Sequence, residues 1–352
     1  RGQNGTPSLF HSAHLAFIFI VSGAEKIGKA ALDERPLFFY IGDTSTRVGR
    51  GRPAPEKRGY RMDLCNINDI KALLARHGFR FSKSMGQNFL IEGWVPRDIA
   101  EASGAAPGCG VLEVGPGIGP LTRELSLRAE RVVSVELDRS LFPILAETLA
   151  DRPNAEICPG DILKTDIPAL VREKFQGLTP LACANLPYNI TSPAITALLE
   201  AKCFSAITVM IQREVARRIC APPGSPDYGA FSVFCQYHAH TELLFDVPPD
   251  CFLPAPKVTS SVLRMVPKAP LAEVDDEAHF FRVVRAAFAQ RRKTLANSLS
   301  ASLGGSCGKQ AVARAIEACG LPAAVRGERL SISEFAALSR ALRREEAAST
   351  SE

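Results

Sequence analysis

Residues 108–125 read GCGVLEVGPGIGPLTREL, and this stretch predicts the fold of the chain. The apolar run over residues 111–115 is typical of a buried strand, and an apolar-periodic segment from about residue 120 predicts a helix. Glycines at 115, 117 and 119 separate the two. Glycine lacks a Cβ, so such a loop can turn tightly and approach a ligand closely. The stretch therefore predicts the first unit of an α/β fold, with either a ligand loop or a purely structural turn after its strand.

Strands and helices alternate after this stretch. Apolar runs predict four further strands, in RVVSVELD (131–138), AEICPGDI (155–162), PLACANLPY (180–188) and AITVMIQ (206–212). Helical spacing predicts helices in FPILAETLA (142–150) and SPAITALLE (192–200). Such alternation indicates an α/β protein whose parallel sheet carries helices on both faces. In sheets of this kind, ligands bind at the carboxyl ends of the strands.

The two ends of the chain differ from this core. KVTSSVLRMVPKAP (257–270) predicts the last strand and a linker, and from about residue 269 only helix patterns follow. Ser331 and Glu334 are spaced as a capping box at the start of one of these helices. We expect three parts: a disordered arm or upstream extension (1–61), a ligand-binding domain (62–268) and a small all-helical domain (269–352).

The first 61 residues have a composition of their own. Their apolar run LAFIFIV (15–21) is too short to span a bilayer, and no signal-peptide cleavage pattern accompanies it. A segment rich in Gly, Arg and Pro follows, TRVGRGRPAPEKRGYR (46–61). We expect Met62 to be the natural start, and a basic RNA-binding arm is the alternative.

Composition and charge limit the class of protein. A hydrophobic fraction of 46% and a charged fraction of 22% are ordinary for a globular protein. Ten cysteines are present without a C-x-x-C spacing, so neither a zinc knuckle nor a disulfide framework is indicated, and we expect a cytoplasmic protein. Residues 1–61 alone account for the net charge of +5, so the rest of the chain must contact any polyanion through a local basic patch.

The glycine loop and three acids predict the ligand. The glycine spacing is G-x-G-x-G, whereas a dinucleotide fingerprint needs glycine at position 120, where this chain has Pro. Glu113 suits a cationic amino group, and Glu136 ends a strand where an acid can accept hydrogen bonds from ribose hydroxyls. Asp161 ends the next strand, where it can accept from an adenine amino group. Each acid alone is commonly a solvated loop residue, but together they predict S-adenosylmethionine as the cofactor.

Seven motifs, in this order and spacing, resemble those of bacterial ribosomal RNA small-subunit adenine dimethyltransferases. They are GQNFL (86–90), VLEVGPGIGPLT (111–122), VELD (135–138), GDIL (160–163), NLPYNI (185–190), CFLPAPKVTSSV (251–262) and AFAQRRKTLANSL (287–299). The resemblance covers about residues 62–345 and implies a Rossmann-like methyltransferase sheet followed by a small helical domain. It also implies N6,N6-dimethylation of two adjacent adenosines in the 3′-terminal hairpin of small-subunit (16S) rRNA, late in subunit biogenesis.

The resemblance implies partners and cofactor residues as well. The substrate would be small-subunit rRNA in a pre-30S particle, bound by a monomer, with no membrane and no metal. S-adenosylmethionine would be held by Asn88, Leu90, Gly115, Glu136, Asp161 and Asn185, with Gln87, Glu113, Gly117 and Ile162 lining the same pocket.

The NLPYNITSP stretch (185–193) would hold the target adenine. An adenine amino group is a poor nucleophile because its lone pair is delocalised into the ring. If the Asn185 side-chain oxygen and the Pro187 carbonyl accept its two N–H bonds, the lone pair points at the methyl donor. Tyr188 offers a flat face to a base that has left its stack. Phe252 would cover the other face or be a core aromatic, and a simple turn remains the structural alternative for the whole stretch.

Local basic runs are the predicted RNA contacts. FRVVRAAFAQRRK (281–293) contains no acid, and QREVARRI (212–219) carries a second group. A solvated helix face is the usual meaning of such runs, but the resemblance favours contact with phosphates. The candidates are Arg282, Arg285, Arg291, Arg292, Lys293, Arg217 and Arg218, followed by Arg213 and Lys83.

Three other functions fit part of the sequence. A DNA adenine methyltransferase shares the Asn-x-Pro-Tyr logic and differs in its nucleic acid. A non-catalytic ribosome-assembly or transcription factor on the same fold would bind RNA and transfer nothing. A nicotinamide oxidoreductase is disfavoured by the glycine spacing.

Overall fold

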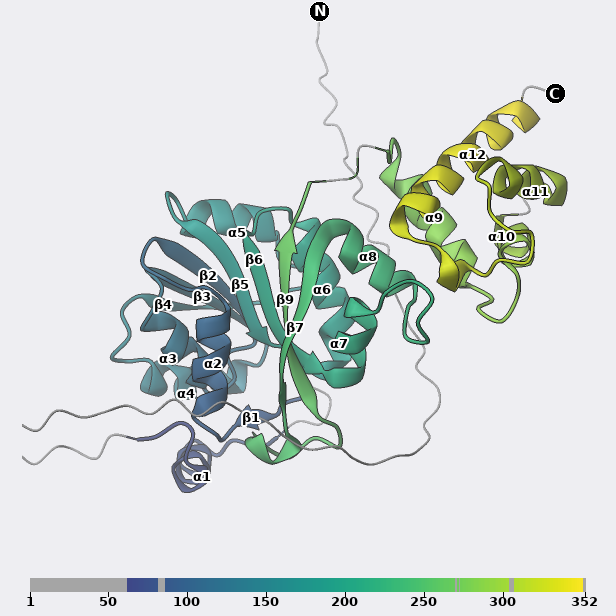
Figure 1. The fold of residues 1–352 in the computed structure, drawn as a ribbon. Coiled ribbons are helices and arrows are strands. Elements are labelled where there is room, and N and C mark those ends of the chain that lie inside the picture. The colour runs from purple at the N-terminus through teal and green to yellow at the C-terminus, as the bar shows by residue number, and fades with distance from the viewer. Residues whose placement is uncertain (1–61, 82–85, 270, 272, 304–306, 351–352) are drawn as a thin grey trace, which may run out of the picture. The chain divides into compact units, whose positions relative to one another are not determined.

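A sheet of seven strands organises the computed structural model of the protein, which describes residues 62–81, 86–269, 271, 273–303 and 307–350 (Figure 1). The expectations for residues 1–61 and for Lys83 lie outside these residues. The strands of the sheet are β2 (Cys109–Val114), β3 (Arg131–Glu136), β4 (Ala155–Pro159), β5 (Thr179–Asn185), β6 (Ala206–Gln212), β7 (Ala239–Val247) and β9 (Ser260–Pro267). Two short strands, β1 (Phe89–Leu90) and β8 (Phe252–Leu253), pair with each other in a separate ladder.

The strand order is β4-β3-β2-β5-β6-β9-β7. Strands β4 to β6 of this order run parallel, and β9 is antiparallel to both of its neighbours. The direction of winding reverses between β2 and β5. Because crossovers between parallel strands are right-handed, the helices on either side of this reversal cover opposite faces. The predicted Rossmann-like α/β sheet with helices on both faces is confirmed (Figure 1). The reversal makes the carboxyl ends of β2 and β5 the switch point, where sheets of this kind bind their ligands.

Strand β7 was not predicted from the sequence. It is one of the two edge strands of the described sheet, it pairs with β9, and its register shifts between Leu243 and Phe245. Most of its side chains are partly or fully exposed. An exposed edge strand needs no continuous apolar run, and the shift breaks the alternation that would reveal it.

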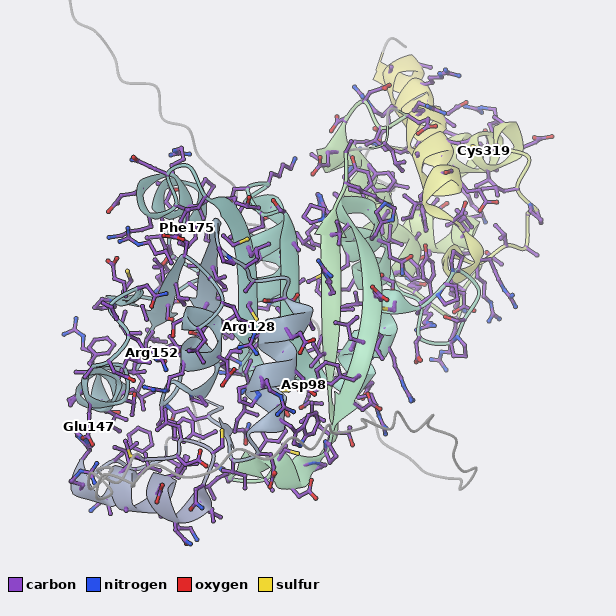
Figure 2. The ribbon with its side chains drawn as sticks, turned by 60° about the vertical axis from the view of Figure 1, so that its left-hand side comes forward. Asp98, Arg128, Glu147, Arg152, Phe175 and Cys319 are labelled. Atoms are coloured by element: carbon purple, nitrogen blue, oxygen red, sulfur yellow. The ribbon has the colours of Figure 1, made fainter. Side chains whose placement is uncertain are left out.

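The helices of the sheet region are α1 (Ile67–Arg76), α2 (Trp94–Ala102), α3 (Pro120–Ser126), α4 (Phe142–Thr148), α5 (Ile167–Lys174), α6 (Thr191–Glu200), α7 (Arg213–Cys220) and α8 (Ala230–His238). Of these, α3, α4 and α6 lie within a few residues of the predicted helices, whereas α2, α5, α7 and α8 were not predicted. Glu147 of α4, labelled in Figure 2, connects this helix to α1. Its carboxylate accepts a hydrogen bond from Arg76 and lies 2.7 Å from Nε2 of His77. These contacts fix α1 just ahead of the GQNFL segment.

After β9 the described residues form helices only: α9 (Glu277–Phe288), α10 (Leu295–Leu303), α11 (Lys309–Ala318), the 3₁₀ turn η5 (Gly327–Arg329) and α12 (Ile332–Thr350). The predicted capping box at the start of α12 is confirmed. The Ser331 backbone N–H donates to Oε2 of Glu334 at 2.7 Å, and the Glu334 N–H donates to Oγ of Ser331 at 3.2 Å. Within the described ranges, no helix is both long and apolar enough to cross a membrane.

Aromatic rings join α8 to α9. The centroids of Tyr237 and Phe280 are 5.1 Å apart, and those of Phe234 and Phe281 are 5.3 Å apart. The hydroxyl of Tyr228, in the loop before α8, donates to the Leu330 carbonyl at 3.0 Å. Residues 63–352 accordingly form one compact unit, and the domain boundary that we predict at residue 268 lies between β9 and α9.

His238 makes this aromatic cluster sensitive to pH. The side chain is 8% exposed and its ring centroid lies 4.7 Å from that of Phe234. Burial lowers the pKa of His238 to about 4, so the folded protein holds it neutral at a pH where the unfolded chain binds a proton. Above about pH 6.5, His238 is neutral in both the folded and the unfolded protein and does not change the free energy of unfolding. As the pH drops toward 4, the unfolded chain binds a proton that the folded protein excludes, and the free energy of unfolding falls by about 3 kcal/mol in all.

The measurement is urea unfolding at pH 7.5 and 5. We expect His238→Phe to lose part of the wild-type decrease in unfolding free energy, whereas replacement of the exposed His240 by Gln retains it. An unchanged pH dependence in His238→Phe would show that other groups cause the decrease.

Candidate active site

One cavity of about 190 Å³ lies at the carboxyl ends of β2, β3 and β5. Five chain segments enclose it: the GQNFL segment, the glycine loop, the end of β3, residues 160–163 and the turn after β5. It is lined by every residue predicted to hold the cofactor: Gln87, Asn88, Leu90, Glu113, Gly115, Gly117, Glu136, Asp161, Ile162 and Asn185. Pro187 and Tyr188 line it as well, and Phe252 is not among its lining residues.

The glycine loop depends on backbone angles that favour glycine. Gly115, Gly117 and Gly119 have φ values of +68°, +61° and +95°, in the left-handed region. A Cβ on Gly117 would also lie 3.3 Å from the ring of Phe89. Pro120 then occupies the first turn of α3, where its missing N–H costs no hydrogen bond. The loop therefore turns sharply from β2 into α3 and places its backbone along the cavity.

Glu113 is a buried carboxylate at the floor of this loop. It is 1% exposed, and its Oε2 accepts hydrogen bonds from the hydroxyls of Thr122 at 2.7 Å and Ser134 at 2.6 Å. Burial raises the pKa of Glu113 to about 7, although these two hydrogen bonds lower it. A cationic group in the cavity would favour its ionised form.

Glu136 and Asp138 form a connected pair at the end of β3. Oε1 of Glu136 accepts the Asp138 backbone N–H at 2.7 Å, and the carboxyl group is 7% exposed. Oδ2 of Asp138 accepts a hydrogen bond from Nε2 of Gln87 at 2.7 Å. Asp138 was missed in the sequence, although the VELD motif contains it. It links the GQNFL segment to the strand that carries Glu136.

Asp161 lies on the next strand end. Its Oδ1 accepts the Leu163 N–H at 3.0 Å, and its Oδ2 lies 3.8 Å from Nζ of Lys164. The side chain is 26% exposed and lines the cavity. Ile162 beside it is 4% exposed and supplies an apolar wall.

Asn185 begins the turn after β5. Its Nδ2 donates to the carbonyl of Asn88 at 3.3 Å, which leaves the side-chain oxygen as the group available to a ligand. The Pro187 carbonyl, which we expect to accept an amine, already accepts the Ile190 N–H at 3.1 Å and the Thr191 hydroxyl at 3.3 Å. Within the described residues no hydrogen bond reaches the carbonyl of Leu186, which also lines the cavity.

The two aromatic candidates lie in different surroundings. Tyr188 lines the cavity and its hydroxyl lies 2.7 Å from Oγ of Ser260. Phe252 is 2% exposed, pairs with Leu90 in the small ladder and belongs to the apolar core. In this arrangement the ring of Phe252 packs as a core aromatic, and stacking on a base would require it to move.

The predicted RNA-binding side chains fall into two groups. Several are engaged within the protein: Arg282 with Glu346 at 2.7 and 2.9 Å, Arg291 with Glu328 at 2.9 Å, Arg218 with Glu214 at 2.9 Å and Arg213 with Asp246 at 3.4 Å. Arg285 is half-buried on α9. Among the described residues, Arg217, Arg292 and Lys293 are exposed and form no ion pair; we call these three the basic surface.

The hydrogen-bond acceptors of the cavity select its ligand. Four carboxylates line it, and no Lys or Arg is among the described residues that do so. A pyrophosphate would meet negative charge there, which argues against a dinucleotide. An amino cation, ribose hydroxyls and an adenine amino group instead offer hydrogen-bond donors to these acids. S-adenosylmethionine carries all three.

An acidic cavity at the switch point of this sheet fits the class of Rossmann-like, S-adenosylmethionine-dependent methyltransferases. The family model described as "Ribosomal RNA adenine dimethylase" matches residues 78–326. The chain belongs to that family. It is an rRNA adenine dimethyltransferase, and its methyl donor is S-adenosylmethionine.

Individual relatives agree with this assignment. Ribosomal RNA small subunit methyltransferase A of Geobacillus kaustophilus is 44% identical over 284 residues, 80% of this chain and 97% of that protein. The protein of the same name from Shouchella clausii is 46% identical over 283 residues, 80% of this chain and 96% of that one. The crystal structure of a dimethyladenosine transferase from Plasmodium falciparum, 22% identical, gives a TM-score of 0.62 over 73% of this chain and 98% of that chain, and so shows the same fold.

Proposed function

We propose that this enzyme dimethylates two adjacent adenosines in the 3′-terminal hairpin of small-subunit rRNA, as a cytoplasmic monomer acting on a pre-30S particle. The observation that supports it most is the position of the Asn185–Tyr188 turn. This turn lines the same cavity as the four carboxylates, so one side of the cavity is suited to the donor and the other to an amine.

The carboxylates hold the cofactor in this proposal. Glu136, whose Oε1 already accepts the Asp138 N–H, also accepts hydrogen bonds from the ribose hydroxyls. Asp161 accepts from the adenine amino group, and Ile162 packs against the ring. Glu113, buried at the glycine loop, attracts the amino cation. When bound, S-adenosylmethionine supplies an electrophilic methyl group on its sulfonium.

The turn prepares the attacking nitrogen. The side-chain oxygen of Asn185 accepts one N–H of the adenine amine, because Asn88 holds the amide nitrogen and so fixes its orientation. We assign the second acceptor to the Leu186 carbonyl, since the Pro187 carbonyl is engaged within its own turn. Two acceptors on one amine draw its nitrogen toward tetrahedral geometry and stabilise the positive charge that grows on it. The excess proton leaves to water after transfer.

The same two acceptors can hold the monomethylated amine for a second methyl transfer. A monomethylated amine keeps one N–H, which either acceptor can hold. The other oxygen then faces a methyl group and loses a hydrogen bond. We expect the second transfer to be slower than the first for this reason.

The basic surface holds the RNA in this proposal. We expect the double variant Arg292→Ala/Lys293→Ala to raise the KM for small subunits about tenfold with little change in kcat, because these cations contact phosphate and lie outside the cavity. The slope of log affinity against log salt concentration is negative, and its magnitude should decrease by about two, one for each lost phosphate contact. Binding to undermethylated subunits at several salt concentrations measures both effects.

The matched control is Arg97→Ala, which removes an exposed arginine that pairs with Asp98 on α2. It should leave KM and the salt slope unchanged. An unchanged salt slope in the double variant would contradict the assignment of the basic surface to phosphate.

The proposed function is tested by supplying labelled cofactor and undermethylated small subunits to the full chain. Digestion of the rRNA should yield labelled dimethyladenosine from two neighbouring positions of the 3′-terminal hairpin. Label in duplex DNA and not in rRNA would favour a DNA adenine methyltransferase. Binding to the particle without any label would favour a non-catalytic assembly factor.

A further inference from the structure

Ser260 contacts the aromatic residue of the turn from a distant part of the chain. Its Oγ lies 2.7 Å from the Tyr188 hydroxyl, across 72 residues of sequence. Ser260 is 0% exposed, and Tyr188 is half-buried. Ser260 does not line the cavity, so it reaches a substrate only through Tyr188.

The hydroxyl of Ser260 is held at a fixed point of the sheet. Ser260 is the first residue of β9 and pairs with Gln212 of β6 on one side and Val247 of β7 on the other. The residues beside it are also bound: the Thr259 carbonyl accepts the Arg213 N–H at 3.0 Å, and Ser261 donates to Asp246 at 2.5 Å. A side chain on a strand paired on both sides moves little.

Tyr188 lacks such support of its own. It begins the three-residue 3₁₀ turn η3 (Tyr188–Ile190), outside the sheet ladder. Among the described residues, Ser260 is the one group that bonds its hydroxyl. Burial raises the pKa of Tyr188, so the phenol stays neutral, and either hydroxyl can donate the hydrogen bond to the other. The hydrogen bond therefore fixes the tilt of the ring from its far end.

We propose that Ser260 is a positioning residue for methyl transfer, which holds the ring of Tyr188 as the platform for the extruded adenine. The inference rests on the proposed function, in which Tyr188 stacks on the base. A stacked base keeps its amine between the Asn185 oxygen and the Leu186 carbonyl only while the platform is still. Loss of the hydrogen bond leaves the base bound and misaligned, which slows the chemical step.

The first experiment separates kcat from binding. Ser260→Ala should lower kcat about tenfold, as expected when a buried phenol loses its partner, with the cofactor Kd and the KM for undermethylated subunits changed less than about threefold. Ser261→Ala is the matched control, because it also removes a 0% exposed hydroxyl from β9 but does not contact Tyr188. It should keep the wild-type kcat at a similar cost in thermal stability. A wild-type kcat in Ser260→Ala, or an equal loss in both variants, would overturn the proposal.

A double-mutant cycle gives a readout that a general loss of stability would not produce. Tyr188→Phe keeps the ring and removes the hydroxyl, so it breaks the same hydrogen bond from the other side. We expect the Tyr188→Phe/Ser260→Ala variant to be no slower than the slower single variant. A rate equal to the product of the two single losses would show that the residues act independently.

Tyr188→Ala distinguishes failure of this inference from failure of the stacking role on which it rests. If Tyr188→Ala transfers methyl groups at the wild-type rate, the roles of Tyr188 and Ser260 are both wrong, while the methyltransferase function stands; only absence of transfer by the wild-type protein would refute that function. If Tyr188→Ala is strongly impaired while Ser260→Ala is not, the stacking role stands and only the role of Ser260 is refuted.

Discussion

Asn185→Ala should lower kcat by about 10³-fold while leaving binding to small subunits unchanged. The variant removes a hydrogen-bond acceptor, the Asn185 side-chain oxygen, that points at the adenine amine before the reaction begins. Removing one preorganised group of this kind commonly costs about 10²- to 10³-fold. The loss should be at the upper end, because the variant also frees the Asn88 carbonyl that holds the amide in place.

Single-turnover transfer to undermethylated subunits measures this effect without interference from product release. Asn68→Ala is the control, since Asn68 is exposed on α1 and outside the cavity. A kcat within threefold of wild type for Asn185→Ala would remove Asn185 from the catalytic machinery. A large rise in the cofactor Kd with normal transfer at saturation would leave it with a cofactor-binding role alone.

Glu136→Ala should weaken binding of S-adenosylmethionine by about 10²-fold or more. A carboxylate that accepts two ribose hydroxyls makes two charge-assisted hydrogen bonds, each worth about 1.5 to 3 kcal/mol. Burial raises the pKa of Glu136, so its charged form is poorly solvated and gains much from such partners. Glu136→Gln keeps one acceptor oxygen and should show an intermediate loss.

Isothermal titration with the cofactor gives these affinities directly. Glu130→Ala removes an exposed acid just before β3 and should bind as tightly as wild type. A Kd for Glu136→Ala within threefold of wild type would contradict the ribose assignment.

The acids and the turn could be predicted because their signals are local. In a parallel sheet the carboxyl ends of neighbouring strands meet, so a polar residue that closes an apolar run is placed in space by its position in sequence. Glu136, Asp161 and Asn185 are found in this way, and all three line the cavity.

Contacts that depend on tertiary pairing could not be predicted. Nothing near Ser260 in the sequence indicates that Tyr188 lies against it, and nothing in the basic run shows that Glu346 and Glu328 engage Arg282 and Arg291. A run of basic residues shows which side chains are cationic, whereas the acids that pair with them lie on segments far along the chain. The Pro187 assignment has the same limit, because a short motif does not show which carbonyl its own 3₁₀ turn already uses.

The position of β9 has a consequence for the order in which the enzyme becomes competent during its own synthesis. Every residue lining the cavity precedes Thr191, whereas β9 begins at Ser260 and inserts between β6 and β7. A chain emerges from the ribosome with its N-terminal part first. The residues proposed to bind the methyl donor are therefore synthesised before β9, the strand that carries Ser260. The support of Tyr188 is therefore completed only after all the cavity-lining residues have been synthesised.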